Sequence, residues 1–435
     1  MLSPALHGSD AKYRLLLDIS QEISRTFDLQ EVVNHLLATV RSVVEYDAAG
    51  VFVLHRNVPT GPPWGTPIAP AMGGNVIAAM ASVGFEHRTI ENDPMLRTGA
   101  GIVGHVINTG ERVIASDVSN DPHYIQGRIE TRSELAVPIV SNGTVIGALN
   151  LESDQLAAFS EDDADLLEAL AVAAAICIEK AVLHRHMIQK ELIDAQLKIA
   201  KDVQSSLLPA GPPGVAGYDL AGLNVPTWDI GGDYFDYLSL PDGRLGLVIA
   251  DVSGKGVPAA LLMATFRATL RAAASRNRAI PVIVDELHRT LVESMDVSRY
   301  VTAVYGVLEP RTGRFTYLNC GHNPPILLRA SGRWERLRTS RRAIGMLAND
   351  PVPVSVTTLA RGDTLLMYTD GVVDAANAEY REFGERRLVS ALQASAAGPA
   401  AAILDALVYE TRAHTGRDHY DDDFTLVVVK RFAAG

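Results

Sequence analysis

The sequence predicts a multidomain α+β protein, in which an antiparallel sheet with flanking helices is followed by a long helix and then an α/β sandwich. Three observations lead to this fold class. The 435-residue chain is too long for one ordinary domain. Apolar segments are joined by the turn pairs Asn142-Gly143, Asp242-Gly243 and Thr312-Gly313, which are typical of antiparallel hairpins. No proline or glycine occurs from Glu161 to Leu208, and this stretch predicts one unbroken helix.

The composition is that of a folded globular protein, with 47% hydrophobic and 21% charged residues. The net charge of -12 argues against a general nucleic-acid or anionic-membrane binder, because both need a basic face. Two cysteines, Cys177 and Cys320, are too few for a disulfide framework and fit a reducing compartment. The start of the chain lacks the pattern of a signal peptide, and charges interrupt the apolar stretch 166–183, so we expect a cytoplasmic protein.

Residues 1–160 are expected to form the first domain. The elements expected in it are a helical segment, two strands, a short helix and a hairpin, in the ranges 16–40, 48–55, 75–85, 101–110 and 134–153. The segment 56–74 is rich in proline and glycine and is expected to be a loop. Ser160, followed by three acids, predicts the start of the next helix.

Residues 161–208 are expected to form a helical linker. Its second half carries an apolar stripe on an otherwise charged helix, at Ile193, Leu197, Ala200, Val203 and Leu207. This helix either docks on its own domain or is a self-associating linker between two domains, as a coiled coil, and the pattern favours a homodimer. At the end of the helix, Val203 and Leu207 are expected to pack on the following domain.

Residues 209–435 are expected to form the last domain. Strands and helices alternate, and because the hairpins make the sheets mostly antiparallel, the helices are expected to cover the outer faces of a sandwich. The expected helices have the ranges 258–275, 280–295, 385–394 and 399–415.

Carboxylates recur at the ends of apolar strands in this domain, at Asp233, Asp251, Asp370 and the pair Asp422-Asp423. If these strand ends converge, the carboxylates repel one another, and divalent cations remove the repulsion. Ligands that are all oxygen favour Mg²⁺ or Mn²⁺ over softer metals. Aspartate before glycine is also a common turn pair, and spacing alone leaves both interpretations open.

Five motifs occur in an order that resembles the PPM-type, metal-dependent serine/threonine phosphatases of the SpoIIE/RsbU branch. The motifs are GGDYFD, ADVSGKGVPAALLMA, NCGHNPPILL, TDGVVDAAN and DDFTLVVV. This resemblance covers about residues 193–432 and implies two central antiparallel sheets flanked by helices. The first domain resembles a GAF domain through RSELAVPIVSNGTVIGALNLES and the segment that begins GIVGHVINTGERVIASD.

The resemblance implies which residues form the site. The catalytic metal ligands are expected at Asp233, Asp251, Asp370 and Asp422, together with the backbone carbonyl of Val252. Asp251 is implied to bridge two Mn²⁺ or Mg²⁺ ions that activate a water for attack on phosphorus. Three consecutive aspartates leave open whether Asp422 or Asp423 is the last ligand.

The resemblance also implies partners. The expected substrate is a phosphorylated anti-sigma-factor antagonist, a small STAS-domain protein, and a small molecule or a protein is expected to act on the GAF-like domain. The alternative is a non-catalytic scaffold that binds a small ligand and a phosphoprotein. Lys255 can meet phosphate or remain a solvated turn lysine. A cysteine phosphatase is excluded because no arginine lies six residues after Cys320, and no Gly-x-Ser-x-Gly elbow of a serine hydrolase occurs.

Overall fold

The computed structural model describes residues 29–54, 77–85, 100–294, 299–338, 341–346 and 354–433. The start of the first expected helix, from Leu16 to Ile23, and the expected loop 56–74 lie outside these residues. The chain divides into two compact units, Met1–Ile193 and Asp194–Gly435, and each is described by itself.

The first unit is built around one antiparallel sheet of five strands in the order β2-β1-β5-β4-β3. The strands are β1 (Ala48–Leu54), β2 (Ile77–Val83), β3 (Val113–Ala115), β4 (Ser133–Ser141) and β5 (Thr144–Ser153). The helices are α2 (Leu29–Val43), α3 (Gly101–Thr109), the short 3-10 helix η4 (Val118–Asn120) and the first part of α4 (Glu161–Leu207). The elements expected from the sequence are therefore confirmed where the structure describes them.

The turn residues and the helix-capping residue predicted for this unit have the expected conformations and contacts. Asn142 and Gly143 both have positive φ, 47° and 75°, as the two-residue turn between β4 and β5 requires. Ser160 and Asp163 form a capping box at the start of α4: the Ser160 amide donates to Oδ2 of Asp163 over 2.9 Å, and the Asp163 amide donates to Oγ of Ser160 over 3.3 Å. One face of the sheet packs on α2 and α4, and the other packs on α3.

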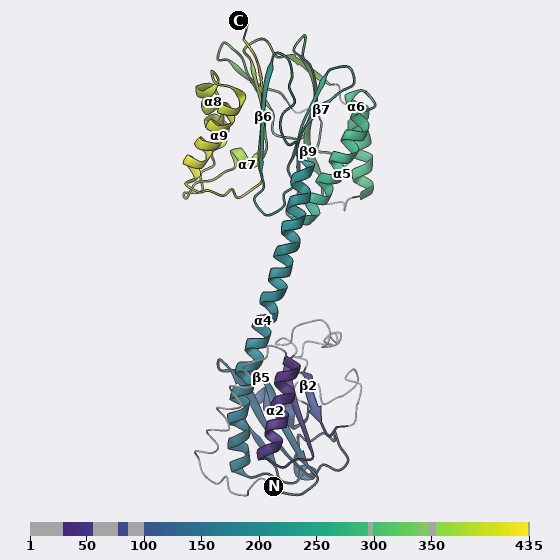
Figure 1. Ribbon diagram of the computed structural model, residues 1–435, viewed down its shortest axis with the longest axis vertical. Helices are drawn as coiled ribbons and strands as arrows, with labels where there is room; N and C mark the ends of the chain where they lie inside the picture. The colour runs from purple at the N-terminus through teal and green to yellow at the C-terminus, as the bar shows by residue number, and fades with distance from the viewer. Residues whose placement is uncertain are drawn as a thin grey trace. The chain divides into compact units, whose positions relative to one another are not determined.

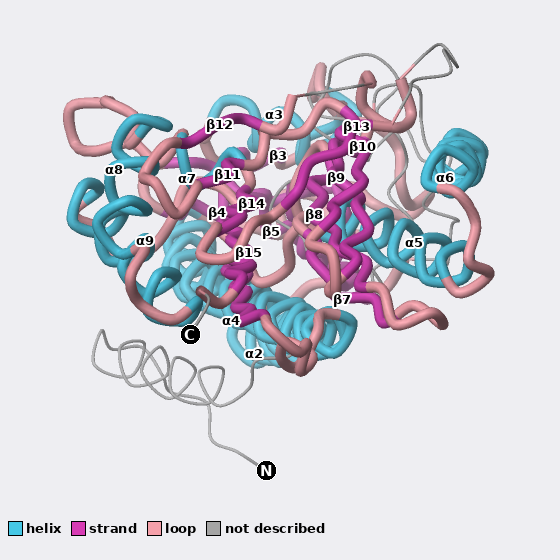
Figure 2. Tube along the Cα trace, turned by 90° about the horizontal axis from the view of Figure 1, so that it is seen from above, coloured by secondary structure: helices cyan, strands magenta, loops and turns pink. Residues whose placement is uncertain are grey.

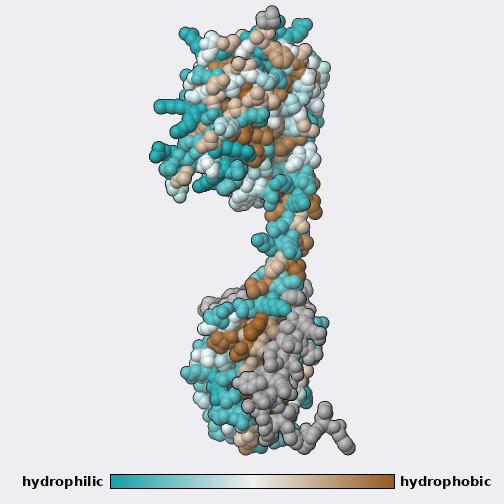
Figure 3. Space-filling model, turned by 60° about the vertical axis from the view of Figure 1, so that its left-hand side comes forward, coloured by the Kyte–Doolittle hydropathy of each residue, from teal (hydrophilic) through white to brown (hydrophobic). Residues whose placement is uncertain are grey.

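Helix α4 changes character along its length. Its first half buries apolar side chains against the sheet, among them Leu167, Leu170 and Ile178. Large apolar side chains that begin within this first half and continue to Val203 are more than half exposed: Val172, Ile176, Leu183, Met187, Ile188, Leu192, Ile193, Ile199 and Val203. Brown atoms along the helix in Figure 3 show the hydrophobic character of this surface. The apolar surface is therefore longer than the stripe that the sequence predicted.

The last turn of α4 corrects one expectation. Leu207 does pack against the core of the second unit, as predicted. Val203 does not, because its side chain is 58% exposed. Residue 203 lies one helical turn before Leu207 on the same side of the helix, and the sandwich covers this side only at the last turn.

The second unit contains two antiparallel sheets of five strands each, in the orders β13-β10-β9-β8-β7 and β12-β11-β14-β15-β6. The strands of the first sheet are β7 (Tyr234–Ser239), β8 (Leu245–Val252), β9 (Val301–Glu309), β10 (Arg314–Cys320) and β13 (Ser355–Thr358). Those of the second are β6 (Tyr218–Val225), β11 (Ile326–Leu328), β12 (Trp334–Arg336), β14 (Thr364–Tyr368) and β15 (Phe424–Arg431). The helices are α5 (Val257–Ala274), α6 (Ile280–Ser294), α7 (Asp370–Val373), α8 (Gly384–Ser395) and α9 (Ala400–Thr415).

These elements form four layers. Helices α5 and α6 cover the outer face of the β7–β10 sheet, and α8 and α9 cover the outer face of the other sheet (Figures 1 and 2). A third apolar core fills the space between the sheets and includes Phe235, Ile249, Phe315 and Val427. The predicted sandwich with two central antiparallel sheets is confirmed. No helix in the described part of the chain has the length and apolar character needed to cross a bilayer.

Candidate metal centre

The acids singled out in the sequence do lie at strand ends. Asp233 directly precedes β7, and Asp251 is the penultimate residue of β8 in the same sheet. Asp370 begins α7 two residues after the end of β14, and Asp422 lies two residues before β15 in the opposite sheet. The candidate site therefore draws its carboxylates from both sheets of the sandwich.

Hydrogen bonds join these strand ends across the sandwich. Oδ2 of Asp233 accepts from the hydroxyl of Thr369 over 2.8 Å and from that of Thr425 over 2.6 Å. Thr369 precedes Asp370, and Thr425 is the second residue of β15. Asp233 is 3% exposed, so these two threonines supply the partners that a buried carboxylate needs.

Burial and mutual repulsion disfavour the charged form of several of these carboxylates. Burial, and then the charges of Asp251 and Asp423, hold the pKa of Asp233 well above its usual range. Burial, followed by the charges of Asp370, Asp422 and Asp423, raises the pKa of Asp251 to about 7. Burial and Asp422 raise the pKa of Asp370 as well. The acids are thus close enough to repel one another, and the positive charge present does not compensate them.

Asp423 differs from Asp422 in its surroundings. The carboxylate of Asp423 accepts backbone N–H groups from Gly232 over 2.6 Å and from Thr227 over 2.8 Å. Asp422 is half-exposed, and its Oδ1 lies 3.0 Å from the ammonium of Lys255. Asp423 is therefore engaged in ordering the loop before β7, whereas Asp422 retains a carboxylate that faces solvent.

Glycines allow the backbone segments of the site to approach closely. A Cβ on Gly231 would lie 2.3 Å from Oδ2 of Asp423, and one on Gly232 would lie 2.8 Å from the carbonyl oxygen of Val252. A Cβ on Gly371 would lie 2.1 Å from the carbonyl oxygen of Asp423. Each position excludes a side chain, so packing requires the two glycines before Asp233 and the one after Asp370.

In the structure Lys255 is paired with acceptors and is not simply a solvated turn lysine; its contact with phosphate stays a prediction. Its ammonium donates to the carbonyl of Asp421 over 2.8 Å and forms the ion pair with Asp422. It is the cation that lowers the pKa of both Asp251 and Asp370, although in each case burial and the neighbouring acids have the larger effect.

The donor set fits a hard divalent cation, because it consists of carboxylate and carbonyl oxygens in a region with excess negative charge. Within the described ranges, however, no three His, Cys, Asp or Glu side chains already converge as a metal cluster. The carboxylates that hold an ion would therefore have to turn toward it when it binds. Asp422, which is half-exposed, has the most freedom to do so.

Comparisons with known proteins identify both halves of the chain. A family model described as Stage II sporulation protein E (SpoIIE) matches residues 241–432, and a GAF-domain model matches residues 27–179. The chain carries a GAF domain followed by a SpoIIE-type domain. The SpoIIE match includes Asp251, Asp370 and Asp422 and begins eight residues after Asp233.

Several known proteins are similar in sequence to about half of this chain. Protein IcfG of Synechocystis sp. is 29% identical over 263 residues, which are 54% of this chain and 41% of the relative. Phosphoserine phosphatase RsbU of Bacillus subtilis is 25% identical over 245 residues, which are 56% of this chain and 72% of the relative. The solved RsbU and RsbW domains of Rv1364c from Mycobacterium tuberculosis match with 29% identity and a TM-score of 0.46, over 51% of this chain and 64% of that one.

His322 has a structural role in the SpoIIE-type domain. The side chain of Asn319 accepts the His322 amide over 2.9 Å and donates to the His322 carbonyl over 3.1 Å, which closes the turn after β10. Nδ1 of His322 lies 2.8 Å from the hydroxyl of Thr302. Burial lowers the pKa of His322 to about 4, so the ring is neutral at pH 7.

The GAF domain contains a buried carboxyl pair that the sequence reading missed. Glu134 on β4 is directly opposite Glu152 on β5, and the two are 2% and 1% exposed. Oε2 of Glu152 accepts from the hydroxyl of Thr131 over 2.5 Å, whereas Oε1 of Glu134 has no hydrogen-bond partner. Burial, then the charges of Glu152 and Asp121, raises the pKa of Glu134 well above its usual range. Burial also raises the pKa of Glu152, against the hydrogen bonds from Thr131 and Asn150 and the charge of Arg128.

This pair predicts a pH dependence of GAF-domain stability. Because the folded-state pKa of Glu134 exceeds the unfolded one, the folded domain holds the proton more tightly, and stability is lost as the pH rises through the folded pKa. Glu134→Gln should flatten this dependence and raise the melting temperature at pH 8. The melting temperature is measured by thermal unfolding at pH values from 5 to 8. Glu130→Gln, at an exposed glutamate, is the control. Parallel curves for Glu134→Gln and the wild type would show that the pair is not the cause.

Proposed function

We propose that this protein is a metal-dependent protein serine/threonine phosphatase that is regulated by its GAF domain. The observation that carries the proposal is the group of buried, mutually repelling carboxylates at strand ends from both sheets, in a SpoIIE-type domain. The names of two relatives, the phosphoserine phosphatases RsbU and RsbP of Bacillus subtilis, support the reaction class.

The cofactors we propose are two Mn²⁺ or Mg²⁺ ions. Asp233, Asp251, Asp370, Asp422 and the carbonyl of Val252 would hold them, with Asp423 in the supporting role that its backbone contacts indicate. When bound, such ions supply positive charge for the phosphoryl oxygens and activate water. The residues of the chain contribute the placement of these charges at rigid strand ends.

Hydrolysis is proposed to proceed without a phosphoenzyme. Water attacks phosphorus, the bond between phosphorus and the seryl or threonyl oxygen breaks, and that oxygen takes up a proton. A cysteine nucleophile does not fit, because burial raises the pKa of the Cys320 thiol to about 12 and the side chain is 1% exposed.

The proposed substrate is a phosphorylated STAS-domain antagonist of an anti-sigma factor, in the cytoplasm. We expect phosphate release from such proteins in Mn²⁺ and none in EDTA. The test is a screen of phosphorylated candidate antagonists with the full chain, read by loss of phosphate from the protein. Release that is unaffected by EDTA would exclude the metal mechanism. Binding without release in Mn²⁺ would support a non-catalytic scaffold instead.

We further propose that the chain is a homodimer in which α4 pairs with its copy as a coiled coil. Leu192 and Ile199, one heptad apart, are 59% and 65% exposed, and they continue the series of exposed apolar side chains on this helix. We expect light scattering to show a dimer at micromolar concentration. Leu192→Asp with Ile199→Asp should shift it to a monomer, whereas Lys190→Asp should not. A monomeric wild-type chain would contradict the proposal.

A further inference from the structure

The last turn of α4 touches the loop of the candidate metal centre through one side chain. Nε2 of Gln204 donates to the carbonyl oxygen of Gly231 over 2.6 Å, and Oε1 of Gln204 accepts the N–H of Gly231 over 3.1 Å. One amide thus satisfies both backbone groups of one residue. Because either contact alone leaves Gly231 free to pivot, the pair is what fixes its position and orientation.

Gly231 is packed directly against the acids. It lies two residues before Asp233, and a Cβ on it would lie 2.3 Å from Oδ2 of Asp423. The next residue, Gly232, donates its N–H to Asp423 and lies against the carbonyl oxygen of Val252. A displacement of Gly231 is therefore transmitted to Asp233, to Asp423 and to the proposed carbonyl ligand within two residues.

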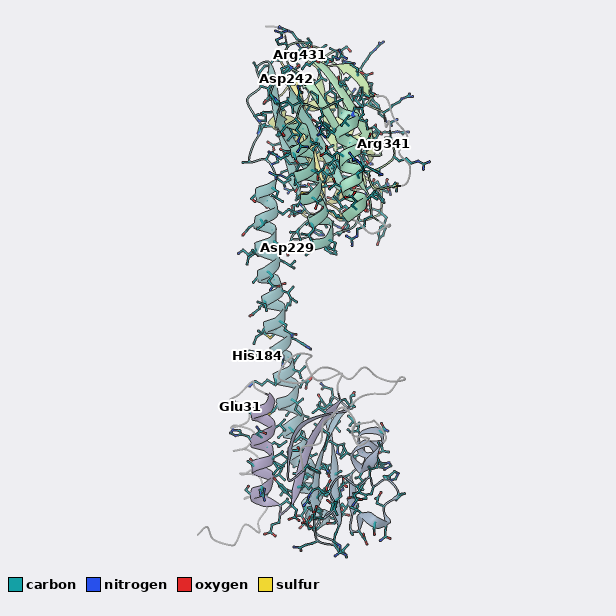
Figure 4. The ribbon with its side chains drawn as sticks, turned by 90° about the vertical axis from the view of Figure 1, so that its right-hand side faces the viewer. Glu31, His184, Asp229, Asp242, Arg341 and Arg431 are labelled. Atoms are coloured by element: carbon teal, nitrogen blue, oxygen red, sulfur yellow. The ribbon has the colours of Figure 1, made fainter. Side chains whose placement is uncertain are left out.

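The helix side of this contact is also held in place. Leu207 and Leu208 pack on the core under α5 and α6, so the last turn of α4 is anchored to the sandwich. A second contact is weaker: Nζ of Lys201 lies 3.7 Å from Oδ1 of Asp229, which Figure 4 labels beside α4, and both side chains are about half-exposed. An exposed ion pair of this kind contributes little. Since Val203 faces solvent, Gln204 is the main link from this turn to the loop.

We infer that Gln204 is a positioning residue for the metal centre: it ties Gly231, and through it Asp233, to the last turn of α4. The two hydrogen bonds of Gln204 support the positioning of Gly231. The expected effect on metal binding rests on the proposed metal-dependent function. A rotation of the end of α4 breaks or strains the amide contact and moves the loop that carries Asp233. The metal affinity of the centre then depends on the state of this helix.

The test compares Gln204→Met with Gln196→Met in the full-length chain. Methionine has nearly the same length and no hydrogen-bonding amide, and Gln196 is an exposed glutamine two turns earlier on the same helix. Calorimetric titration with Mn²⁺ should show about tenfold weaker binding for Gln204→Met, as expected for the loss of one to two net hydrogen bonds. Gln196→Met should bind like the wild type. The KM for a phosphorylated substrate should change less than the Mn²⁺ requirement.

A second measurement keeps the inference independent of activity. Amide hydrogen exchange without metal should be faster at residues 231–233 in Gln204→Met and unchanged in Gln196→Met. Gln204→Glu, which keeps the acceptor for the Gly231 amide but loses the donor, should lie between them. Exchange and Mn²⁺ affinity equal to those of the wild type in Gln204→Met would overturn the inference. A wild type that binds no Mn²⁺ and releases no phosphate would instead overturn the proposed function, and the exchange result would still decide the positioning role.

Discussion

Asp370→Asn should reduce metal-dependent phosphate release by about a thousandfold without unfolding the SpoIIE-type domain. Asparagine keeps the size of the side chain and removes the negative charge that the proposed ions require. The loss corresponds to several kcal/mol of transition-state charge stabilisation, at about 1.4 kcal/mol for each factor of ten. Steady-state rates at saturating Mn²⁺ measure the effect, and circular dichroism checks the fold.

The same substitution should leave the metal-free domain at least as stable as the wild type. Burial and then the charge of Asp422 raise the pKa of Asp370, so removing its charge relieves the cluster. Asp421→Asn is the matched control, because Asp421 is an exposed neighbour of Asp422 and is not a proposed ligand. It should retain nearly full activity. A rate for Asp370→Asn within tenfold of the wild-type rate would remove Asp370 from the catalytic set.

Arg271→Met should lower the free energy of unfolding of the second unit by about 3 kcal/mol. The side chain of Asp236 on β7 is fully buried. Nε and an Nη of Arg271 donate to its two oxygens over 2.7 and 2.9 Å. The hydroxyl of Tyr234 donates to Oδ2 over 2.5 Å, and the Tyr237 amide donates to Oδ1 over 2.8 Å. Without the arginine, a buried carboxylate is left with no cation, and desolvation is no longer offset.

The control for this variant is Arg278→Met, which breaks the more exposed ion pair between Arg278 and Glu286 and should cost less than about 1 kcal/mol. Hydrogen exchange of amides in β7 and α5 during urea titration measures the free energy of unfolding of this unit separately from that of the GAF domain. The double variant Asp236→Asn with Arg271→Met should recover part of the loss, because the uncompensated charge is then absent. A loss below 1 kcal/mol for Arg271→Met would mean that solvent already screens Asp236.

Much of the fold follows from local sequence signals. The capping residue Ser160 and the absence of proline and glycine predicted α4, whose observed bounds are Glu161–Leu207. The turn pair Asn142-Gly143 predicted the β4–β5 hairpin, and both residues have the positive φ that this turn needs. These features depend on interactions within a few residues, so the sequence alone determines them. The sequence also predicted that the acids lie at strand ends, because local apolar runs and turn residues define where strands end.

Other features depend on contacts between distant parts of the chain. The sequence left the choice between Asp422 and Asp423 open, and only the fold brings Gly232, 191 residues away, to donate its N–H to Asp423. The buried pair of Glu134 and Glu152 arises from strand register. The hydrogen bonds between Gln204 and Gly231 join residues 27 positions apart in the chain. A single glutamine produces no periodic pattern from which its contact could be predicted. An apolar stripe likewise does not show which of its side chains pack against another element, as the exposed Val203 illustrates. The sequence by itself determined the elements, their order and the residue types available for chemistry. Only the tertiary structure decided which of these residues meet, because burial and hydrogen-bond partners are set by the packing of whole sheets and helices rather than by neighbours along the chain.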